Sequence, residues 1–169
     1  MNQNTFISLI DPVKDKMYRL ALRLLVSREA AEDATQEVLI KLWNRNSKLK
    51  HYANFEAFVM TVTKNHCLDQ LKLKQNNNLK IVHNNYESKE NNIHKQLEYS
   101  DEVDLVSIIL KDLPEQQKLI FQLRDVEQYE FEEISEITQM NETAIRVTLS
   151  RVRKKIREEL KKKHNYGIS

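Results

Sequence analysis

The sequence predicts an all-α protein built from two small helical domains that a flexible linker joins. The chain of 169 residues contains one Gly and two Pro, whereas hairpin turns and sharp bulges usually require Gly. Apolar residues instead recur at helical spacing in both halves. Between the halves, residues 75–100 are Asn-rich and show no amphipathic face, which is typical of a linker. The expected domains are therefore residues 1–74 and 101–169.

Composition also argues against several classes of protein. The one cysteine, Cys67, cannot form an internal disulfide or a Cys-cluster zinc site. The five His are scattered without ligand spacing, and no phosphate-binding loop or nucleophile beside a base is visible. We therefore expect no enzyme activity, no metal and no cofactor. The first 16 residues hold no long apolar run, so we expect no signal peptide, no membrane insertion and a cytoplasmic location.

The first half reads as about four helices. Pro12 is expected to divide the first apolar stripe into a short and a longer helix, because Pro fits best in a first turn. Ser27 is expected to cap the next helix, which buries Trp43 on its apolar face. Residues 52–74 then predict a helix, a break at Lys64–Asn65, and a further helix that Asn65 caps.

The helix after Ser27 carries a crowded acidic and amide face. Like charges on one helical face destabilise an isolated helix. The face is therefore either simply solvated or covered by a partner. Its residues are Glu29, Glu32, Asp33, Gln36 and Glu37.

The second half begins with two predicted helices and an acidic loop. A capping box is expected at Asp112–Glu115, with Pro114 in the first turn. The helix that follows should bury Leu119, Ile120, Leu123 and Val126.

Residues 131–163 predict a helix-turn-helix. Asn141 should cap the second helix, whose buried stripe is Ile145, Leu149, Val152, Ile156 and Leu160. From residue 141 onward there are nine Lys/Arg against three acidic residues, whereas residues 101–140 hold three against eleven. The opposite face suits a major groove, where Arg can read guanine and an exposed Val can touch a thymine methyl. That face carries Thr143, Val147, Ser150, Arg151 and Lys154, with Arg146 and Arg157 on one flank.

Three kinds of function fit parts of this pattern. A stand-alone helix-turn-helix regulator that binds duplex DNA as a dimer explains the second half. It gives no function to the acidic helix after Ser27 or to the aromatic segment within residues 52–74. A pure interaction protein, such as an adaptor or decoy, would use its basic end only as a solubilising tail. The third reading follows from a resemblance that both halves show.

Both halves resemble a known family. The segments AEDATQEVLIKLW and FEAFVMTVTKNHCLDQLK are similar to region 2 of sigma-70-family RNA polymerase sigma factors. The segment from Asp112 to Ile156, DLPEQQKLIFQLRDVEQYEFEEISEITQMNETAIRVTLSRVRKKI, is similar to region 4. With only these two regions and a short linker, the chain resembles the extracytoplasmic-function (ECF) group.

The resemblance implies roles for the first half. Asp33, Gln36 and Glu37 would dock on the clamp helices of the largest subunit of core RNA polymerase. The segment with Phe55, Phe58 and Asn65 would open the −10 promoter element and hold a flipped base, as aromatic and amide side chains can. Phe58 as a core residue and Asn65 as a helix cap remain alternatives. Phosphates would be held by Lys64, Lys72 and Lys74.

The resemblance also implies that the second half reads the −35 element of promoter DNA and binds the flap of the second-largest polymerase subunit. The assigned reading residues are Thr143, Arg146, Val147, Thr148, Ser150, Arg151 and Lys154. Members often have Gly near Gln139 and Thr143, and Arg in place of Thr148; Gln139 therefore suggests a turn that needs no positive φ. An anti-sigma factor, often membrane-bound in this group, is a further implied partner.

Overall fold

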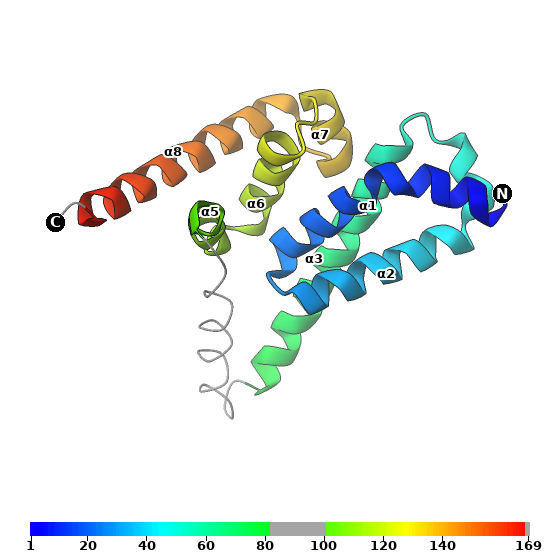
Figure 1. Ribbon diagram of the computed structural model, residues 1–169, viewed down its shortest axis with the longest axis horizontal. Helices are drawn as coiled ribbons and strands as arrows, with labels where there is room; N and C mark the ends of the chain where they lie inside the picture. Colours follow the sequence, from blue (N-terminus) through cyan, green and yellow to red (C-terminus); the bar gives the residue numbers. More distant parts are fainter. Residues whose placement is uncertain (82–100, 168–169) are drawn as a thin grey trace.

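The computed structural model describes residues 1–81 and 101–167, and it confirms the all-helical fold (Figure 1). No strand occurs in either described range. In chain order the elements are α1 (Gln3–Leu25), α2 (Arg28–Asn44), the 3₁₀ turn η1 (Asn46–His51), α3 (Phe55–Ile81), α5 (Asp101–Lys111), α6 (Glu115–Phe121), the π turn η2 (Gln122–Val126), α7 (Phe131–Thr138) and α8 (Glu142–Gly167).

Helix α1 is continuous, so the predicted division at Pro12 is wrong. Pro12 lies on the exposed side of the helix together with Ser8, whose carbonyl loses its helical partner and can bond to water instead. Ile10 and Val13, on either side of the proline in the sequence, are both buried, and α1 packs against α2 and α3. Tertiary packing therefore outweighs the local cost of the proline.

Helix α2 begins as predicted, because the Ala30 amide donates to Ser27 Oγ at 3.2 Å. Trp43 is not buried as expected but is 37 % exposed. Its ring packs edge-on against Phe6, with 5.2 Å between the ring centroids. The end of α2 therefore shows an aromatic face to solvent.

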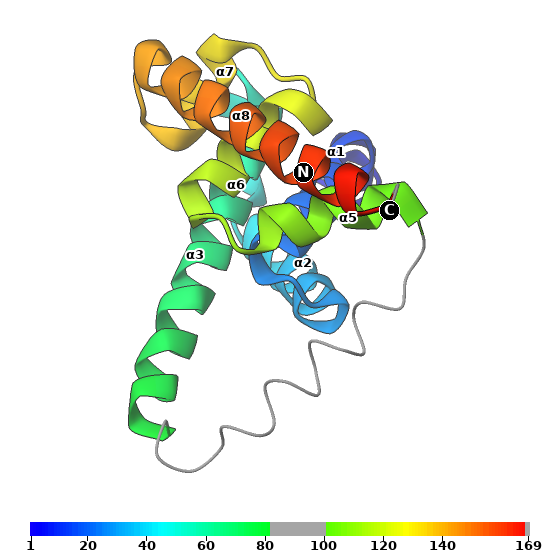
Figure 2. The ribbon, with the colours of Figure 1, turned by 90° about the vertical axis from the view of Figure 1, so that its left-hand side faces the viewer.

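Helix α3 runs unbroken through Lys64 and Asn65, so the predicted break and the predicted Asn65 cap are both wrong. The cap is Asn54, whose Oδ1 accepts from the Ala57 amide at 3.0 Å. Neither Gly nor Pro occurs near residue 64, and Cys67 is fully buried on the next turn. The helix continues to Ile81, and residues 82–100 of the expected linker lie outside the described range. Figure 2 shows its last turns extending beyond the other helices.

The second half departs from prediction at its caps. Pro114 precedes α6 without any side-chain cap, so the capping box expected at Asp112–Glu115 is wrong. Val126, expected to be buried, is 39 % exposed at the end of the π turn. A true capping box forms at α7, where the side chains of Glu130 and Glu133 each accept from the other residue's backbone amide. Glu is not among the favoured N-cap residues, so the sequence gives little sign of it.

The two halves pack together. Helix α1 lies against α6 and η2, α3 lies against α7, and one buried apolar cluster runs from Phe6 to Leu149. Polar contacts cross the same junction: the Arg19 guanidinium donates to both carboxylate oxygens of Glu127 at 2.6 and 2.9 Å, and Arg23 Nε donates to Gln122 Oε1 at 2.9 Å. A second apolar cluster joins α5 to α8 through Ile109, Leu110, Val152 and Ile156.

Candidate nucleic-acid interface

The helix-turn-helix is formed by α7, a tight turn and α8. Asn141 caps α8 as predicted, since its Oδ1 accepts from the Ala144 amide at 2.8 Å. The turn is tied to α7 by Ser135 Oγ, which donates to the Met140 carbonyl at 2.6 Å. Met140 is half-buried against the main core. The two helices are thus held at a fixed angle by capping and packing together.

Gln139 has φ 63° and ψ 19°, so the turn does require a positive φ, contrary to the sequence expectation. Its backbone amide donates to the Ser135 carbonyl, as expected of a left-handed residue after a helix. Its side chain partly compensates, because Nε2 donates to the Glu136 carbonyl at 2.9 Å.

Gln139→Gly is expected to raise the free energy of unfolding by about 1 kcal/mol, because a residue with a Cβ is strained in the left-handed region. Urea denaturation followed by circular dichroism measures it. Gln139→Ala is the matched control, since it loses the same side-chain hydrogen bond but keeps a Cβ. If Gly and Ala give the same midpoint, strain at this turn contributes nothing.

Helix α8 has the two faces predicted for it. Ile145, Leu149, Val152 and Ile156 are buried, and Leu160 is half-buried. The opposite face is exposed along its length, and Val147 in its middle is 44 % exposed. Its exposed members are Thr143, Val147, Ser150, Arg151 and Lys154; Thr148 is half-buried at its edge.

Two arginines of α8 are held by neighbours. The Arg146 guanidinium lies 4.5 Å from the centroid of the Phe131 ring and 3.8 Å from Glu142, so its position beside the exposed face is fixed. Arg153 forms a bidentate pair with Asp125 at 2.5 and 3.0 Å, and that hydrogen bond raises the pKa of Arg153. Arg153 therefore faces η2 and is not part of the exposed basic face.

The structure separates the predicted α3 residues. Asn65 and Lys72 are exposed, whereas Lys64 is only 8 % exposed. Lys64 Nζ donates to the Ile137 carbonyl at the end of α7, at 2.7 Å. Burial lowers the pKa of Lys64. In this arrangement the Lys64 ammonium is covered by the helix-turn-helix.

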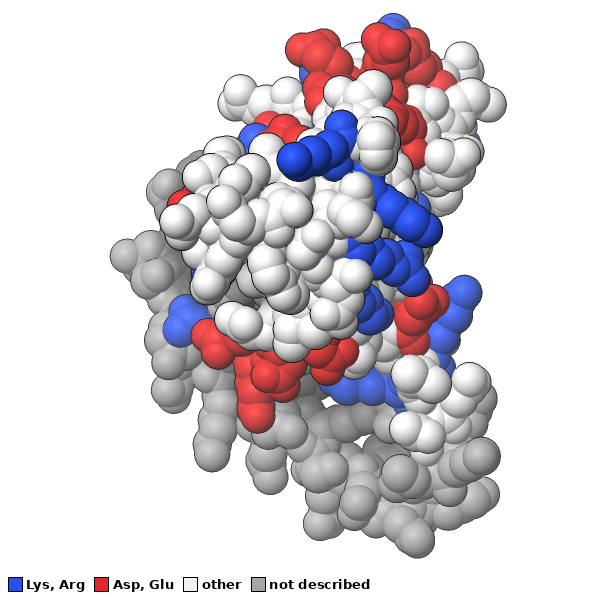
Figure 3. All heavy atoms as spheres, turned by 90° about the vertical axis from the view of Figure 1, so that its right-hand side faces the viewer, with Lys and Arg blue, Asp and Glu red and all other residues white. Residues whose placement is uncertain are grey.

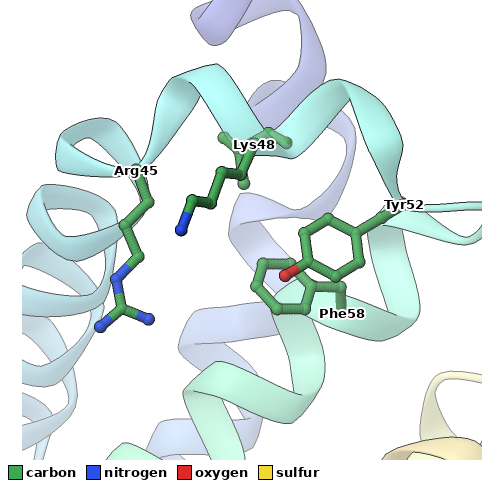
Figure 4. Close-up of a pocket in the computed structure, with 5 residues that line it drawn as sticks. Arg45, Lys48, Tyr52 and Phe58 are labelled. Atoms are coloured by element: carbon green, nitrogen blue, oxygen red, sulfur yellow. The ribbon is translucent and has the colours of Figure 1, made fainter.

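Phe58 lies in a small open pocket with residues that the sequence analysis missed (Figure 4). Its ring stacks on Tyr52, with 3.8 Å between centroids and 13° between planes. Arg45 and Lys48 stand on the other side of the opening, and Leu49 completes a cavity of about 370 Å³. Phe55 is half-buried and does not line it. The basic run from Arg45 to His51, next to Tyr52, was the signal that could have revealed the pocket.

The acidic face of α2 is exposed as predicted, with Asp33, Gln36 and Glu37 all open to solvent. Figure 3 views the right-hand side of Figure 1, where basic side chains gather between acidic groups at the top and bottom of the face.

Across the described ranges, no group of three His, Cys, Asp or Glu side chains could hold a metal ion. Among the described helices, none combines the length and apolar character that a membrane crossing requires.

Comparison with known proteins agrees with this geometry. The family described as "Sigma-70 region 2" matches residues 9–76, and "Sigma-70, region 4" matches residues 109–156. The chain is 24 % identical over 172 residues to a "Probable RNA polymerase sigma factor" of Haemophilus influenzae, covering 91 % of this chain and 89 % of that protein.

The fold is also similar to a solved structure, the sigma factor RpoE in complex with the anti-sigma factor NepR from Bartonella quintana. The TM-score is 0.78 at 20 % identity, covering 93 % of this chain and 97 % of the other. Together the two family matches span more than half of the chain, with region 2 before region 4. The chain therefore belongs to the sigma-70 family of RNA polymerase sigma factors, in the extracytoplasmic-function group, and acts in transcription initiation.

Proposed function

We propose that this chain is a dissociable initiation subunit that binds core RNA polymerase, recognises −35 and −10 promoter elements, and promotes strand opening. One observation carries the proposal: the same chain presents an exposed helix-turn-helix face and, on separate elements, an aromatic pocket rimmed by basic side chains. The first suits duplex DNA and the second suits an unpaired base. A regulator that binds only duplex DNA needs no such pocket.

The −35 element would lie along α8. Arg151 is exposed in the middle of the face, between Val147 and Lys154, where it can reach base edges. Arg146, held over Phe131, and Thr148 at the edge would contact the neighbouring backbone or bases. Lys154 would contact phosphate, so binding would weaken steeply as salt is raised.

Arg151→Ala is expected to weaken −35-dependent binding by the holoenzyme about tenfold, because a bidentate Arg contact is worth roughly 1–3 kcal/mol. Competition with duplexes that carry or lack the −35 element measures it. Arg153→Ala is the matched control, since Arg153 is paired with Asp125 away from the face. Equal losses for the two variants, or loss of polymerase binding with Arg151→Ala, would contradict this assignment.

The −10 element would be opened at the junction of η1 and α3. The exposed Tyr52 ring, stacked on Phe58, offers a face on which an unpaired base can lie, and Arg45 and Lys48 offer charges for its phosphates. Lys72 and Asn65 are exposed farther along α3 and would contact the strand beyond the pocket. Phe55, half-buried at the start of α3, would act beside the pocket, whose aromatic walls are Tyr52 and Phe58.

Core polymerase would dock on α2. Asp33, Gln36 and Glu37 form an exposed acidic and amide surface, which suits a basic partner such as the clamp helices. The helices before α7 would contact the flap of the second-largest subunit. The similar RpoE structure contains an anti-sigma factor, which supports a partner of that kind here, soluble or membrane-bound.

Promoter-specific transcription with core polymerase tests the proposal as a whole. Purified chain and core enzyme are expected to co-elute and to give a transcript from the chain's own promoters without ATP hydrolysis before initiation. Neither the core enzyme alone nor the chain alone should give this transcript. A chain that binds promoter duplex as a dimer but does not co-elute with core enzyme would support the stand-alone regulator instead.

A further inference from the structure

His66 of α3 lies under the acidic face of α2 and is 7 % exposed. Its Nδ1 is 2.9 Å from Lys41 Nζ, and its Nε2 is 3.2 Å from Glu37 Oε2. Glu37 and Lys41 are one turn apart on α2, and both are exposed on their own helix. One buried ring therefore contacts two opposite charges of the α2 surface.

The two contacts fix the tautomer of His66. A lysine ammonium can only donate, so Nδ1 must be the acceptor. The ring proton is then on Nε2, where it can donate to the Glu37 carboxylate. The Gln70 amide nitrogen, 3.5 Å from the same ring nitrogen, is itself a donor and forms no hydrogen bond with it in this tautomer. This arrangement requires a neutral ring. Burial, followed by the charge of Lys41, lowers the pKa of His66, which keeps the ring neutral at physiological pH.

An exposed Glu side chain has many rotamers, and fixing it costs entropy when a partner binds. The His66 ring holds Glu37 from below while leaving the carboxylate open to solvent on its other side. We propose that His66 is a positioning residue, which pre-orients Glu37 for a basic surface of core RNA polymerase. This rests on the proposed docking role of α2 and adds to it a residue that does not touch the polymerase.

Protonation of His66 should disturb the surface. Both ring nitrogens would then donate, so Lys41 would lose its acceptor and face a like charge. Glu37 would then form an ion pair with the His66 imidazolium. The positive charge of that ring would partly cancel the negative charge that Glu37 presents to the polymerase. The charged groups that face the ring are Glu37 and Lys41 from α2 and Asp69 from α3. Binding should therefore weaken as the pH falls through the pKa of His66, below its usual 6.5.

Two substitutions separate positioning from packing. His66→Leu keeps an apolar filler but removes both contacts, and it is expected to weaken core polymerase binding roughly fivefold at pH 7.5, the loss expected of one hydrogen bond. His66→Gln can accept from Lys41 and donate to Glu37 through its amide, and it should bind within about twofold of the original chain. Fluorescence titration of labelled chain with core enzyme measures both.

The pH profile gives a readout that a merely structural role would not move. The original chain is expected to lose affinity relative to His66→Gln as the pH falls through the pKa of His66, which NMR titration of the ring locates in the same samples. Taking the ratio of the two removes titration of the polymerase itself. If the ratio stays constant across the pH range in which the His66 ring titrates, or if folded His66→Leu binds like the original chain, the positioning role is overturned. Should His66→Leu fail to fold, the pH ratio alone decides.

Glu37→Ala separates this inference from the docking proposal. Weaker polymerase binding by Glu37→Ala, together with an unchanged His66→Leu, would retain docking and reject positioning. Unchanged binding by Glu37→Ala would remove Glu37 from the docking surface and reject positioning with it, whereas the surface as a whole is tested by reversing the charge of Asp33 and Glu37 together. If both roles are correct, the His66→Leu and Glu37→Ala effects should be less than additive in the double variant, because each removes the same oriented carboxylate.

Discussion

Reversing the charge at two positions of α2, with Asp33→Lys and Glu37→Lys together, is expected to weaken binding to core RNA polymerase by roughly 100-fold. Both side chains are exposed and lie on one face of the helix. Like charges placed opposite each other in an interface cost several kcal/mol, and about 3 kcal/mol corresponds to that factor. Equilibrium titration at two salt concentrations measures the change, and higher salt should reduce it.

The control for this prediction changes the net charge equally on another helix. Asp11 and Asp15 are exposed on a different helix, α1. Asp11→Lys with Asp15→Lys should leave polymerase affinity within about threefold, since only diffuse charge has changed. A similar loss in both double variants would mean that polymerase responds to net charge and that α2 is not the docking surface.

Tyr52→Ala is expected to slow promoter opening by the holoenzyme about 30-fold. The substitution removes the ring that stacks on Phe58 and with it one wall of the pocket. Stacking of a base on an aromatic side chain is worth roughly 1–3 kcal/mol, and about 2 kcal/mol gives this factor. Fluorescence of a 2-aminopurine placed in the −10 element reports unstacking of the bases as the strands open.

Tyr52→Phe serves as the matched control because it keeps the ring and removes only the hydroxyl. It should open promoters at nearly the original rate, and both variants should bind core polymerase and −35 duplex normally. A Tyr52→Phe defect as large as that of Tyr52→Ala would assign the role to the hydroxyl. Normal opening by Tyr52→Ala would remove the pocket from the opening step.

Local sequence signals predicted several local features correctly but not the cap of α6 or the positive φ of Gln139. The spacing of Ile145, Leu149 and Val152 gave the buried face of α8, and the Asn141 and Ser27 caps form as their side chains suggested. The larger errors, which concern where helices end, arose where packing of distant residues decides the outcome. Pro12 stays within a helix because residues on both sides of it are buried, and α3 passes Asn65 without interruption.

The candidate sites divide in the same way. The exposed face around Arg151 follows from helical periodicity alone, so the sequence was sufficient to predict its exposure. The Tyr52–Phe58 pocket depends on how η1 folds back over α3, and the burial of Lys64 depends on where α7 lies. The Lys64 contact joins segments 73 residues apart, and the Tyr52–Phe58 stack depends on the irregular chain between η1 and α3. Helical periodicity describes neither. The sequence showed only that the histidines lack metal-ligand spacing. The contacts of His66 with Lys41 and Glu37 join α3 to α2, so they could not be predicted from the sequence around His66.

The covered ammonium of Lys64 has a consequence for equilibrium. The described arrangement, in which Lys64 donates to the Ile137 carbonyl, is called the closed chain. In an open chain the end of α7 has moved away, and a phosphate can bind the Lys64 ammonium. Under the proposed function, closed and open chains then coexist, and the apparent dissociation constant for a −10 strand equals the intrinsic constant divided by the open fraction. A polymerase that binds the open chain more tightly raises that fraction. By reciprocity, promoter DNA then strengthens the hold of the polymerase on the chain by the same factor, with no contact between the two required.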